Sequence, residues 1–140
     1  MIGARSLFVD TSGWYALTDT RDSGHGAAAR RFRRATGDRR RIVTTNYVVG
    51  ESYTLIMGRP GPPTAQTFLG RVRSSLILQR VHVVDEWEDE AERLLVQYHD
   101  QRFSYVDATS FVTMRRLGIQ EALAFDADFV TAGFTLLGDD

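Results

Sequence analysis

The sequence contains no cysteine and no lysine among its 140 residues. Without cysteine, the chain can form no disulfide, no thiolate metal site and no cysteine nucleophile. Without lysine, all 17 basic residues are arginine, which excludes a P-loop and Schiff-base chemistry, because both depend on a lysine amine. The same absence argues against haloacid-dehalogenase-like phosphatases and response-regulator receivers, which also place aspartates at strand ends but rely on a lysine.

Long apolar runs are also missing from the sequence. No run approaches the roughly 18 residues that a membrane-spanning helix needs, and residues 1–10 are too polar and too short for a secretory signal. The chain is 43% hydrophobic and 25% charged, with a formal net charge of −1, which is typical of a globular protein. We therefore expect a single domain spanning residues 1–140 and a cytoplasmic location.

Short apolar runs alternate with helical patterns along the whole chain. Strands are predicted at residues 7–9, 42–43, 81–84, 122–125 and 135–137. Helices are predicted at about residues 12–17, 23–35, 46–57, 64–74, 86–98 and 104–117. This alternation predicts an α/β fold with a mainly parallel central sheet flanked by helices.

Charge is distributed unevenly despite the near-neutral total. Residues 30–41, which we call the arginine segment, contain seven arginines and one aspartate, whereas residues 85–92 contain six carboxylates. These segments are either two solvated helix faces or surfaces with a binding role. In the second case the arginine segment would contact a polyanion or an acidic segment of a partner.

Two aspartates stand at the ends of predicted strands. Asp10 follows the strand at 7–9, and Asp126 follows the strand at 122–125. Ligands of open α/β sheets bind at the carboxyl ends of the strands. These two aspartates therefore indicate a binding site at that edge of the sheet.

Two further carboxylates lie on helices among apolar residues. Glu51 has Val48 and Leu55 at positions i−3 and i+4, so we expect it on the apolar side of its helix. Asp107 shares a helical stripe with Phe111 and Met114, which follow at i+4 and i+7. We therefore expect both side chains to point inward, where a carboxylate needs a partner.

Ordinary structural roles are open to three of these carboxylates. Asp10 could cap the helix that follows it, Asp107 fits a Ser-x-x-Asp capping box with Ser104, and Asp126 could be a turn residue. Nearby arginines could also pair with one or two of the four. Glu51 is the hardest to explain in this way, because an unpaired carboxylate among apolar neighbours is costly.

If the four carboxylates converge, their mutual repulsion must be relieved. Two charges about 4 Å apart repel by roughly 4 kcal/mol at an effective dielectric constant of 20, so the cluster takes up protons or binds a hard cation. Carboxylate oxygens select Mg²⁺ or Mn²⁺ over zinc, since cysteine is missing and the histidines at 25, 82 and 99 are scattered. An acidic Mg²⁺ site most often serves phosphoryl chemistry.

The four carboxylates lie in segments that together resemble a known family. The segments are Phe-Val-Asp-Thr-Ser-Gly-Trp-Tyr-Ala-Leu (8–17), Thr-Thr-Asn-Tyr-Val-Val-Gly-Glu-Ser-Tyr-Thr-Leu (44–55), Phe-Ser-Tyr-Val-Asp-Ala-Thr-Ser-Phe (103–111) and Ala-Leu-Ala-Phe-Asp-Ala-Asp-Phe (122–129). In order and spacing, they resemble the four acidic blocks of PIN-domain ribonucleases, in particular the VapC-like toxins of bacterial toxin–antitoxin pairs. The resemblance covers nearly the whole chain and implies a PIN-like fold.

The resemblance also implies a chemistry and a set of partners. Asp10, Asp107 and Asp126 would hold Mg²⁺ or Mn²⁺ directly or through water, and Glu51 would complete the site and help to orient the attacking water. The implied reaction is metal-dependent hydrolysis of a phosphodiester in tRNA or rRNA, leaving a 5′-phosphate. A cognate antitoxin that inserts a side chain into the site and a homodimer are the implied protein partners.

The fourth block departs from the usual family pattern at two places. Many members carry Thr or Ser where this chain has Ala124, and an Arg-His or similar pair is frequent where this chain has Ala127 and Asp128. Asp128 could act as a fifth acidic ligand, and the arginine segment could face RNA or the antitoxin. The alternative to an active nuclease is a catalytically silent PIN-like module that binds RNA or a protein partner.

Overall fold

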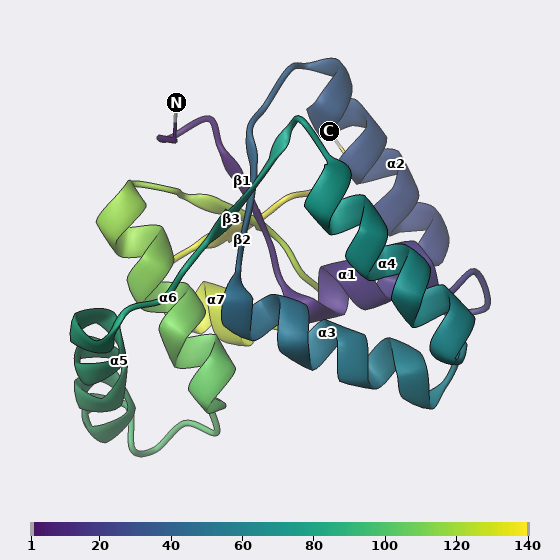
Figure 1. Ribbon diagram of the computed structural model, residues 1–140. Coiled ribbons are helices and arrows are strands. Elements are labelled where there is room, and N and C mark those ends of the chain that lie inside the picture. Colours follow the sequence, from purple (N-terminus) through teal and green to yellow (C-terminus); the bar gives the residue numbers. More distant parts are fainter. Residues whose placement is uncertain (1, 140) are drawn as a thin grey trace.

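A five-stranded sheet forms the centre of the computed structural model, which describes residues 2–139 (Figure 1). The strand order is β3-β2-β1-β4-β5, and every neighbouring pair is parallel. The strands are β1 (Leu7–Val9), β2 (Ile42–Thr45), β3 (Leu78–Val81), β4 (Glu121–Leu123) and β5 (Thr135–Leu136). Because all strands run in one direction, their carboxyl ends meet at one edge of the sheet.

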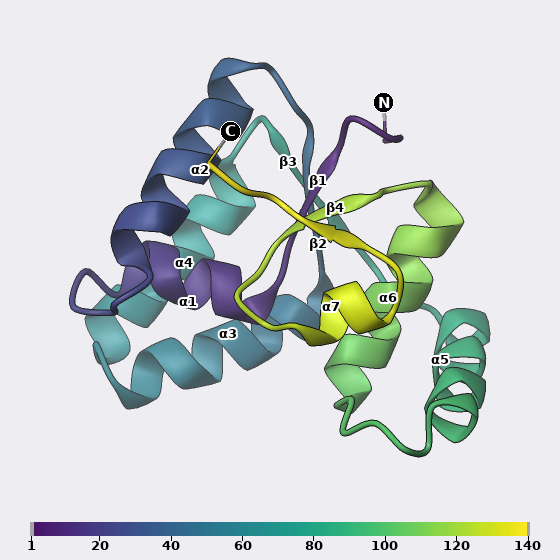
Figure 2. The same cartoon turned by 180° about the vertical axis from the view of Figure 1, so that it is seen from behind.

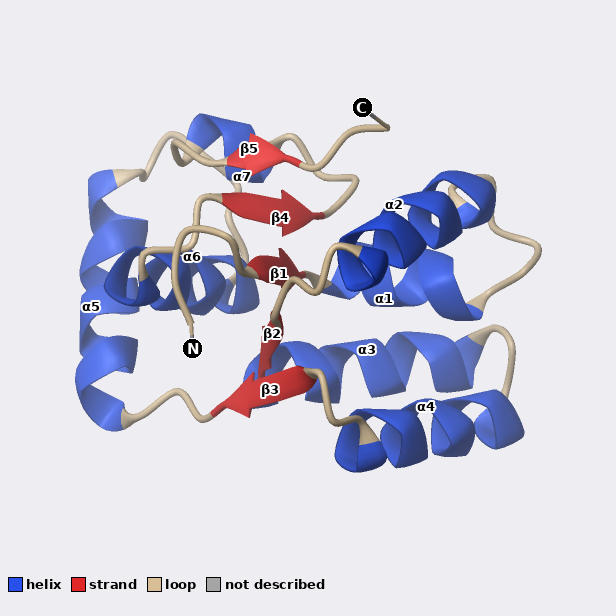
Figure 3. Ribbon diagram, turned by 90° about the horizontal axis from the view of Figure 1, so that it is seen from above, coloured by secondary structure: helices blue, strands red, loops and turns tan. Residues whose placement is uncertain are grey.

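Helices cover the sheet on both sides. They are α1 (Thr11–Thr18), α2 (His25–Gly37), α3 (Asn46–Gly58), α4 (Pro62–Ser74), α5 (Asp85–Gln97), α6 (Tyr105–Leu117) and α7 (Asp128–Thr131). Figure 3 shows α1 to α4 gathered on one side of the sheet, with α5 and α6 on the other. Within residues 2–139, no helix is both long enough and apolar enough to cross a membrane.

The core is built from aromatic residues on either side of the buried strands. Phe111 of α6 meets Phe129 of α7 edge to face, with ring centroids 4.9 Å apart, and Phe8 of β1 lies next to Phe129. On the other side, Trp14 of α1 meets Phe68 of α4 at 5.7 Å. β1 is wholly buried, as expected for a parallel strand covered on both faces, which explains its continuous apolar sequence.

The predicted α/β class and parallel sheet are confirmed, but two strand positions were wrong. The third strand occupies Leu78–Val81 rather than 81–84, because the chain leaves the sheet where the Val83 amide donates to the Asn46 side chain at 2.8 Å. The fourth strand ends at Leu123 rather than 125. Helix α7 was not predicted, since four residues are too few to show a helical period.

Candidate metal centre

Asp10 directly follows β1 and lies next to the end of β4. The register pairs Val9 with Leu123, and the Asp10 amide donates to the Leu123 carbonyl at 3.2 Å. Gly13, in the first turn of α1, makes this close approach possible, because a Cβ there would lie 2.4 Å from the same carbonyl oxygen. The first turn of α1 and the end of β4 therefore hold Asp10 at the carboxyl edge of the sheet.

The Asp10 carboxylate is almost completely buried, with 4% of the residue exposed. Its Oδ2 accepts a hydrogen bond from the Ser12 hydroxyl at 3.2 Å, whereas Oδ1 is buried and has no hydrogen-bond partner within residues 2–139. The side chain makes no capping hydrogen bond to α1, so the capping interpretation does not account for it. Burial, reinforced by the Asp107 carboxylate, raises the pKa of Asp10 from 3.8 to about 7.

Three other aspartates converge from different segments. One carboxylate oxygen from each of Asp107, Asp126 and Asp128 lies within 4.8 Å of the other two. Asp107 belongs to α6, Asp126 to the loop after β4, and Asp128 begins α7, which lies beside α6 in Figure 2. The Asp128 amide donates to Asp126 Oδ1 at 2.9 Å, which ties the two residues of this loop together.

Asp107 combines a structural role with its place in this cluster. It forms the predicted capping box, in which its amide donates to Ser104 Oγ at 2.9 Å and its Oδ2 accepts from the Ser104 amide at 3.0 Å. A carboxylate has about four acceptor positions, so capping leaves room for another ligand. Burial first, and then the charges of Asp126 and Asp128, raise the pKa of Asp107.

The pKa of Asp128 is raised as well, first by partial burial and then by the Asp126 carboxylate. Raised pKa values at two neighbouring carboxyls are the expected result of burial together with like charges that share one site. The electrostatic strain that the sequence predicted is therefore present in the folded chain.

Within residues 2–139, no arginine forms an ion pair with the clustered aspartates. The ion pairs formed within residues 2–139 join other residues: Arg30 and Arg31 to Asp139, Arg40 to Glu121, and Arg116 to Glu86 and Glu90. The alternative that nearby arginines pair with one or two of the four carboxylates is therefore wrong. An unpaired set of oxygen donors, together with the orphaned Oδ1 of Asp10, suits a hard divalent cation.

The structure does not bring Glu51 into the same cluster. Glu51 is half-buried on α3, and its carboxylate is not among the three whose oxygens lie within 4.8 Å of one another. Asp10 is not among those three either, but burial and then the Asp107 charge raise the pKa of Asp10, and this effect of Asp107 places Asp10 beside the cluster. Of its expected apolar neighbours, Val48 is buried but Leu55 is 46% exposed. The expectation that Leu55 shares a buried face with Glu51 was wrong, and the role of Glu51 stays a prediction.

Comparison with known proteins identifies the family. Residues 7–134 match the PIN domain family. The chain belongs to the PIN-domain family. The matched segment, residues 7–134, includes the five candidate carboxylates Asp10, Glu51, Asp107, Asp126 and Asp128. Members of the family typically use a divalent metal ion, and the aspartate cluster of this PIN domain offers oxygen ligands for one.

Individual relatives agree with this assignment. Two proteins named 23S rRNA-specific endonuclease VapC20, from Mycobacterium tuberculosis strains CDC 1551 / Oshkosh and ATCC 25618 / H37Rv, are each 41% identical over 128 residues, which is 91% of this chain and 95% of theirs. A crystal structure of M. tuberculosis VapC20, titled a Sarcin-Ricin loop cleaving toxin, superimposes with a TM-score of 0.86 at 41% identity, covering 93% of this chain and 97% of that one. The predicted resemblance to VapC-like PIN domains is confirmed.

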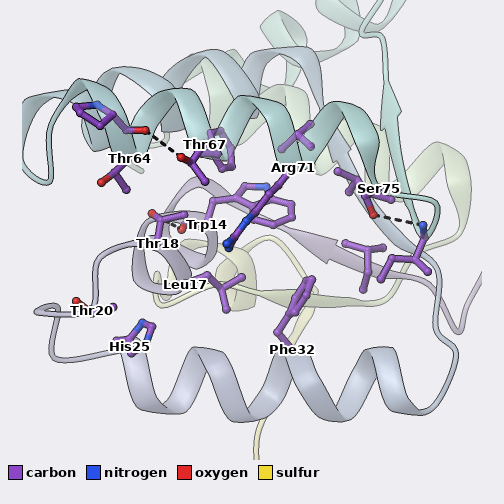
Figure 4. A pocket seen from close by; sticks show the side chains of 16 residues that line it. Trp14, Leu17, Thr18, Thr20, His25, Phe32, Thr64, Thr67, Arg71 and Ser75 are labelled. Carbon is purple, nitrogen blue, oxygen red and sulfur yellow. Dashed lines mark hydrogen bonds between the residues drawn. The ribbon is translucent and has the colours of Figure 1, made fainter.

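One cavity of this PIN domain lies away from the aspartates. Its volume is about 700 Å³, and it lies between α1, α2 and α4 (Figure 4). Trp14, Leu17, Phe32 and Phe68 supply apolar walls, and the Arg71 side chain extends from α4 towards Trp14 and Leu17. None of the five carboxylates lines this cavity, so it is separate from the acidic site.

Ser12 is the site residue that sequence reasoning missed. Its hydroxyl donates to Asp10 Oδ2 and accepts from the Phe125 amide at 3.0 Å. A serine two residues after an aspartate at a strand end is a recognisable local signal. Its second partner is 113 positions away in the sequence, and only the fold brings the two together.

Proposed function

We propose that this PIN domain is a metal-dependent endoribonuclease toxin that cuts 23S rRNA in the sarcin–ricin loop. The observation that carries the proposal is the 41% identity to M. tuberculosis VapC20 across 91% of the chain. The unpaired aspartates at the carboxyl edge of the sheet support it independently. In this proposal residues 1–140 form one nuclease domain that acts in the cytoplasm, where its ribosomal substrate is found.

The aspartates would have different roles in binding the cation. Asp10, Asp107 and Asp126 would hold Mg²⁺ or Mn²⁺. Asp128 would either act as a further ligand, the fifth carboxylate when Glu51 is counted, or hold Asp126 in place. Once bound, the ion would offset charge on the phosphate and lower the pKa of a water molecule. Glu51 would orient the attacking water from α3.

Hydrogen bonds hold three of these carboxylates in place before substrate arrives. Ser12 fixes Asp10, the Ser104 amide fixes Asp107, and the Asp128 amide fixes Asp126. Such supporting contacts orient ligands and avoid reorganisation during the reaction. In the proposed hydrolysis the water oxygen bonds to phosphorus, the bond to the 3′ oxygen breaks, and the products carry a 5′-phosphate and a 3′-hydroxyl.

Two protein partners belong to the same proposal. A chain that cuts ribosomal RNA must be restrained in the cell that makes it, so we propose a cognate antitoxin that inserts a side chain among the aspartates. A homodimer is proposed on the family resemblance.

A cleavage assay tests the proposed function. Purified protein is incubated with ribosomes, with an isolated sarcin–ricin hairpin and with total tRNA, in Mg²⁺, Mn²⁺ or EDTA, and product ends are mapped. We expect one cut in the loop of 23S rRNA that needs metal, with a 5′-phosphate on the downstream product. The Asp107→Asn variant controls for contaminating nuclease. Metal-dependent binding without cutting would favour the catalytically silent module, and cutting of tRNA alone would contradict the rRNA assignment.

A further inference from the structure

Phe125 is the one phenylalanine within residues 2–139 that is exposed, with 43% of its surface accessible. A single exposed apolar residue needs no explanation by itself. This one, however, immediately precedes Asp126 of the aspartate cluster. Its position raises the question of what its ring contacts when substrate is bound.

The backbone of Phe125 is fixed to the candidate metal centre. Its amide donates to Ser12 Oγ at 3.0 Å, and the same hydroxyl donates to Asp10 Oδ2 at 3.2 Å. Phe125 is therefore joined to Asp10 through one serine and to Asp126 through the chain. Any group resting on the ring would be held at a set place relative to the bond that is cut.

Arg31 of α2 provides a cation against this ring. The centre of its guanidinium lies over the Phe125 ring, 5.6 Å from the ring centroid. The Arg31 side chain is 20% exposed, and its Nε pairs with Asp139, whose side chain is 51% exposed. Proteins combine a planar guanidinium with an exposed aromatic ring to bind unpaired bases, through stacking and contact with the nearby phosphate.

The charges on the two sides of the centre favour RNA on the Phe125 side. Helices α2 and α5 lie on opposite sides of the molecule (Figure 3). Helix α2 carries arginines at 30, 31, 33 and 34, whereas α5 begins with acidic residues at 85, 86 and 88 and continues with three more at 89, 90 and 92. A polyanion that reaches the aspartates is repelled by α5 and attracted towards α2, a path that leads over Phe125.

We propose that the exposed ring of Phe125, with the guanidinium of Arg31, is a stacking subsite for an unpaired RNA base next to the phosphodiester that is cut. The inference rests on the proposed nuclease function and adds a substrate-binding residue to it. Stacking tolerates any base, because every base has an aromatic face. The subsite therefore strengthens binding of an unstacked nucleotide. Other contacts select which RNA loop is bound.

Binding of the sarcin–ricin hairpin tests the subsite without relying on catalysis. All variants are made in the Asp107→Asn background, with Mg²⁺ present, and affinity is measured by fluorescence anisotropy of the labelled hairpin. Phe125→Ala and Phe125→Leu remove the aromatic face, and Phe125→Trp restores one. Leu76→Ala is the control, because Leu76 is 96% exposed and precedes β3 at the opposite edge of the sheet.

We expect Phe125→Ala to weaken hairpin binding by about 5- to 100-fold, as removal of a stacking ring does elsewhere. Phe125→Leu should also bind weakly, whereas Phe125→Trp and Leu76→Ala should bind within about 3-fold of the parent. A 2-aminopurine placed beside the mapped cleavage site should be quenched by the parent and by Phe125→Trp only. Because Phe125 is exposed, every variant should melt close to the parent, which thermal unfolding checks.

Arg31 is tested by its effect on salt dependence. Arg31→Gln should weaken binding and make the dependence of log affinity on log salt shallower by about 0.7, the value for one phosphate contact on a single strand. Arg93→Gln, which makes the same charge change at an exposed position of α5, should leave both quantities nearly unchanged.

Equal hairpin binding by the parent, Phe125→Ala and Phe125→Leu, with unchanged 2-aminopurine quenching, would overturn the subsite. Cleavage of the same hairpin by the wild-type chain is measured separately. If that cleavage persists, only the subsite fails. If the parent neither binds nor cuts the hairpin, the proposed function fails and the subsite fails with it.

Discussion

Replacing Asp10 with asparagine removes a charge that folding buries. Burial raises the pKa of Asp10 from 3.8 to about 7, so the folded chain binds a proton more tightly than the unfolded chain. Its contribution to stability is fully present below pH 3.8 and is lost as the pH rises through 7. This rise in pKa corresponds to roughly 4 kcal/mol of lost stability at pH 8 without metal.

Asparagine carries no charge at any pH and should therefore recover most of this loss. Its amide group lacks a full set of partners at the site, which costs about 1–3 kcal/mol. The net expectation is a gain of about 1–3 kcal/mol at pH 8 in EDTA, or a rise of roughly 3–10 °C in melting temperature for a chain of this size. The gain should shrink as the pH falls towards 4.

Calorimetry of wild type and Asp10→Asn between pH 4 and pH 8 measures this difference. Asp38→Asn, at an exposed position, controls for the loss of one negative charge. Added Mg²⁺ should stabilise the wild type and reverse the order, because a ligand of the folded state shifts unfolding by mass action. If Asp10→Asn melts below the wild type at pH 8 in EDTA, Asp10 has a structural role and the reasoning is refuted.

Three other substitutions test separate parts of the centre. Asp107→Asn removes a charged metal ligand and should lower cleavage of the hairpin at least about 100-fold. Because asparagine keeps an acceptor for the capping box, the free energy of unfolding should stay within about 1 kcal/mol of the wild type; an active variant would remove Asp107 from the site. Ser12→Ala should weaken Mn²⁺ binding about 10- to 100-fold in titration calorimetry, because it removes the hydrogen bond that orients Asp10. Unchanged affinity would show that Ser12 does not position this ligand. Gly13→Ala should cost about 1–3 kcal/mol in urea unfolding, because its Cβ meets the Leu123 carbonyl; wild-type stability would show that the contact relaxes freely.

Local sequence patterns were sufficient to predict much of the fold and to single out Asp10, Asp107 and Asp126 as candidate site residues. The apolar run before Asp10 predicts β1 with its observed bounds, because a strand buried on both faces has no polar positions. The Ser104 and Asp107 spacing likewise predicts the start of α6 and its capping box. In both places the signal lies within a few neighbouring residues.

Contacts between distant segments set the limits of this prediction. Val83 and Val84 are good strand formers, yet the chain leaves the sheet at Val81, because the Val83 amide bonds to Asn46 on another element. Asp128 joins Asp107 and Asp126 only through the loop after β4 and the short helix α7. Neither outcome follows from the hydrophobic periodicity of the local sequence.

The same limit applies to Glu51. Helical spacing places it correctly beside Val48, but spacing does not say how much of the α3 surface the neighbouring elements cover. Leu55, one turn further on, is exposed. The distance between the Glu51 carboxylate and the aspartates depends on how α3 packs against α6, which sequence periodicity does not define.

Anomalous diffraction from crystals grown with Mn²⁺ tests the central claim most directly. The account predicts a manganese peak among the carboxylates of Asp10, Asp107 and Asp126, with ligand oxygens about 2.2 Å away, and no peak in crystals of Asp107→Asn. A peak elsewhere on the chain, or no peak at millimolar Mn²⁺, would contradict the assignment of these aspartates as a metal centre.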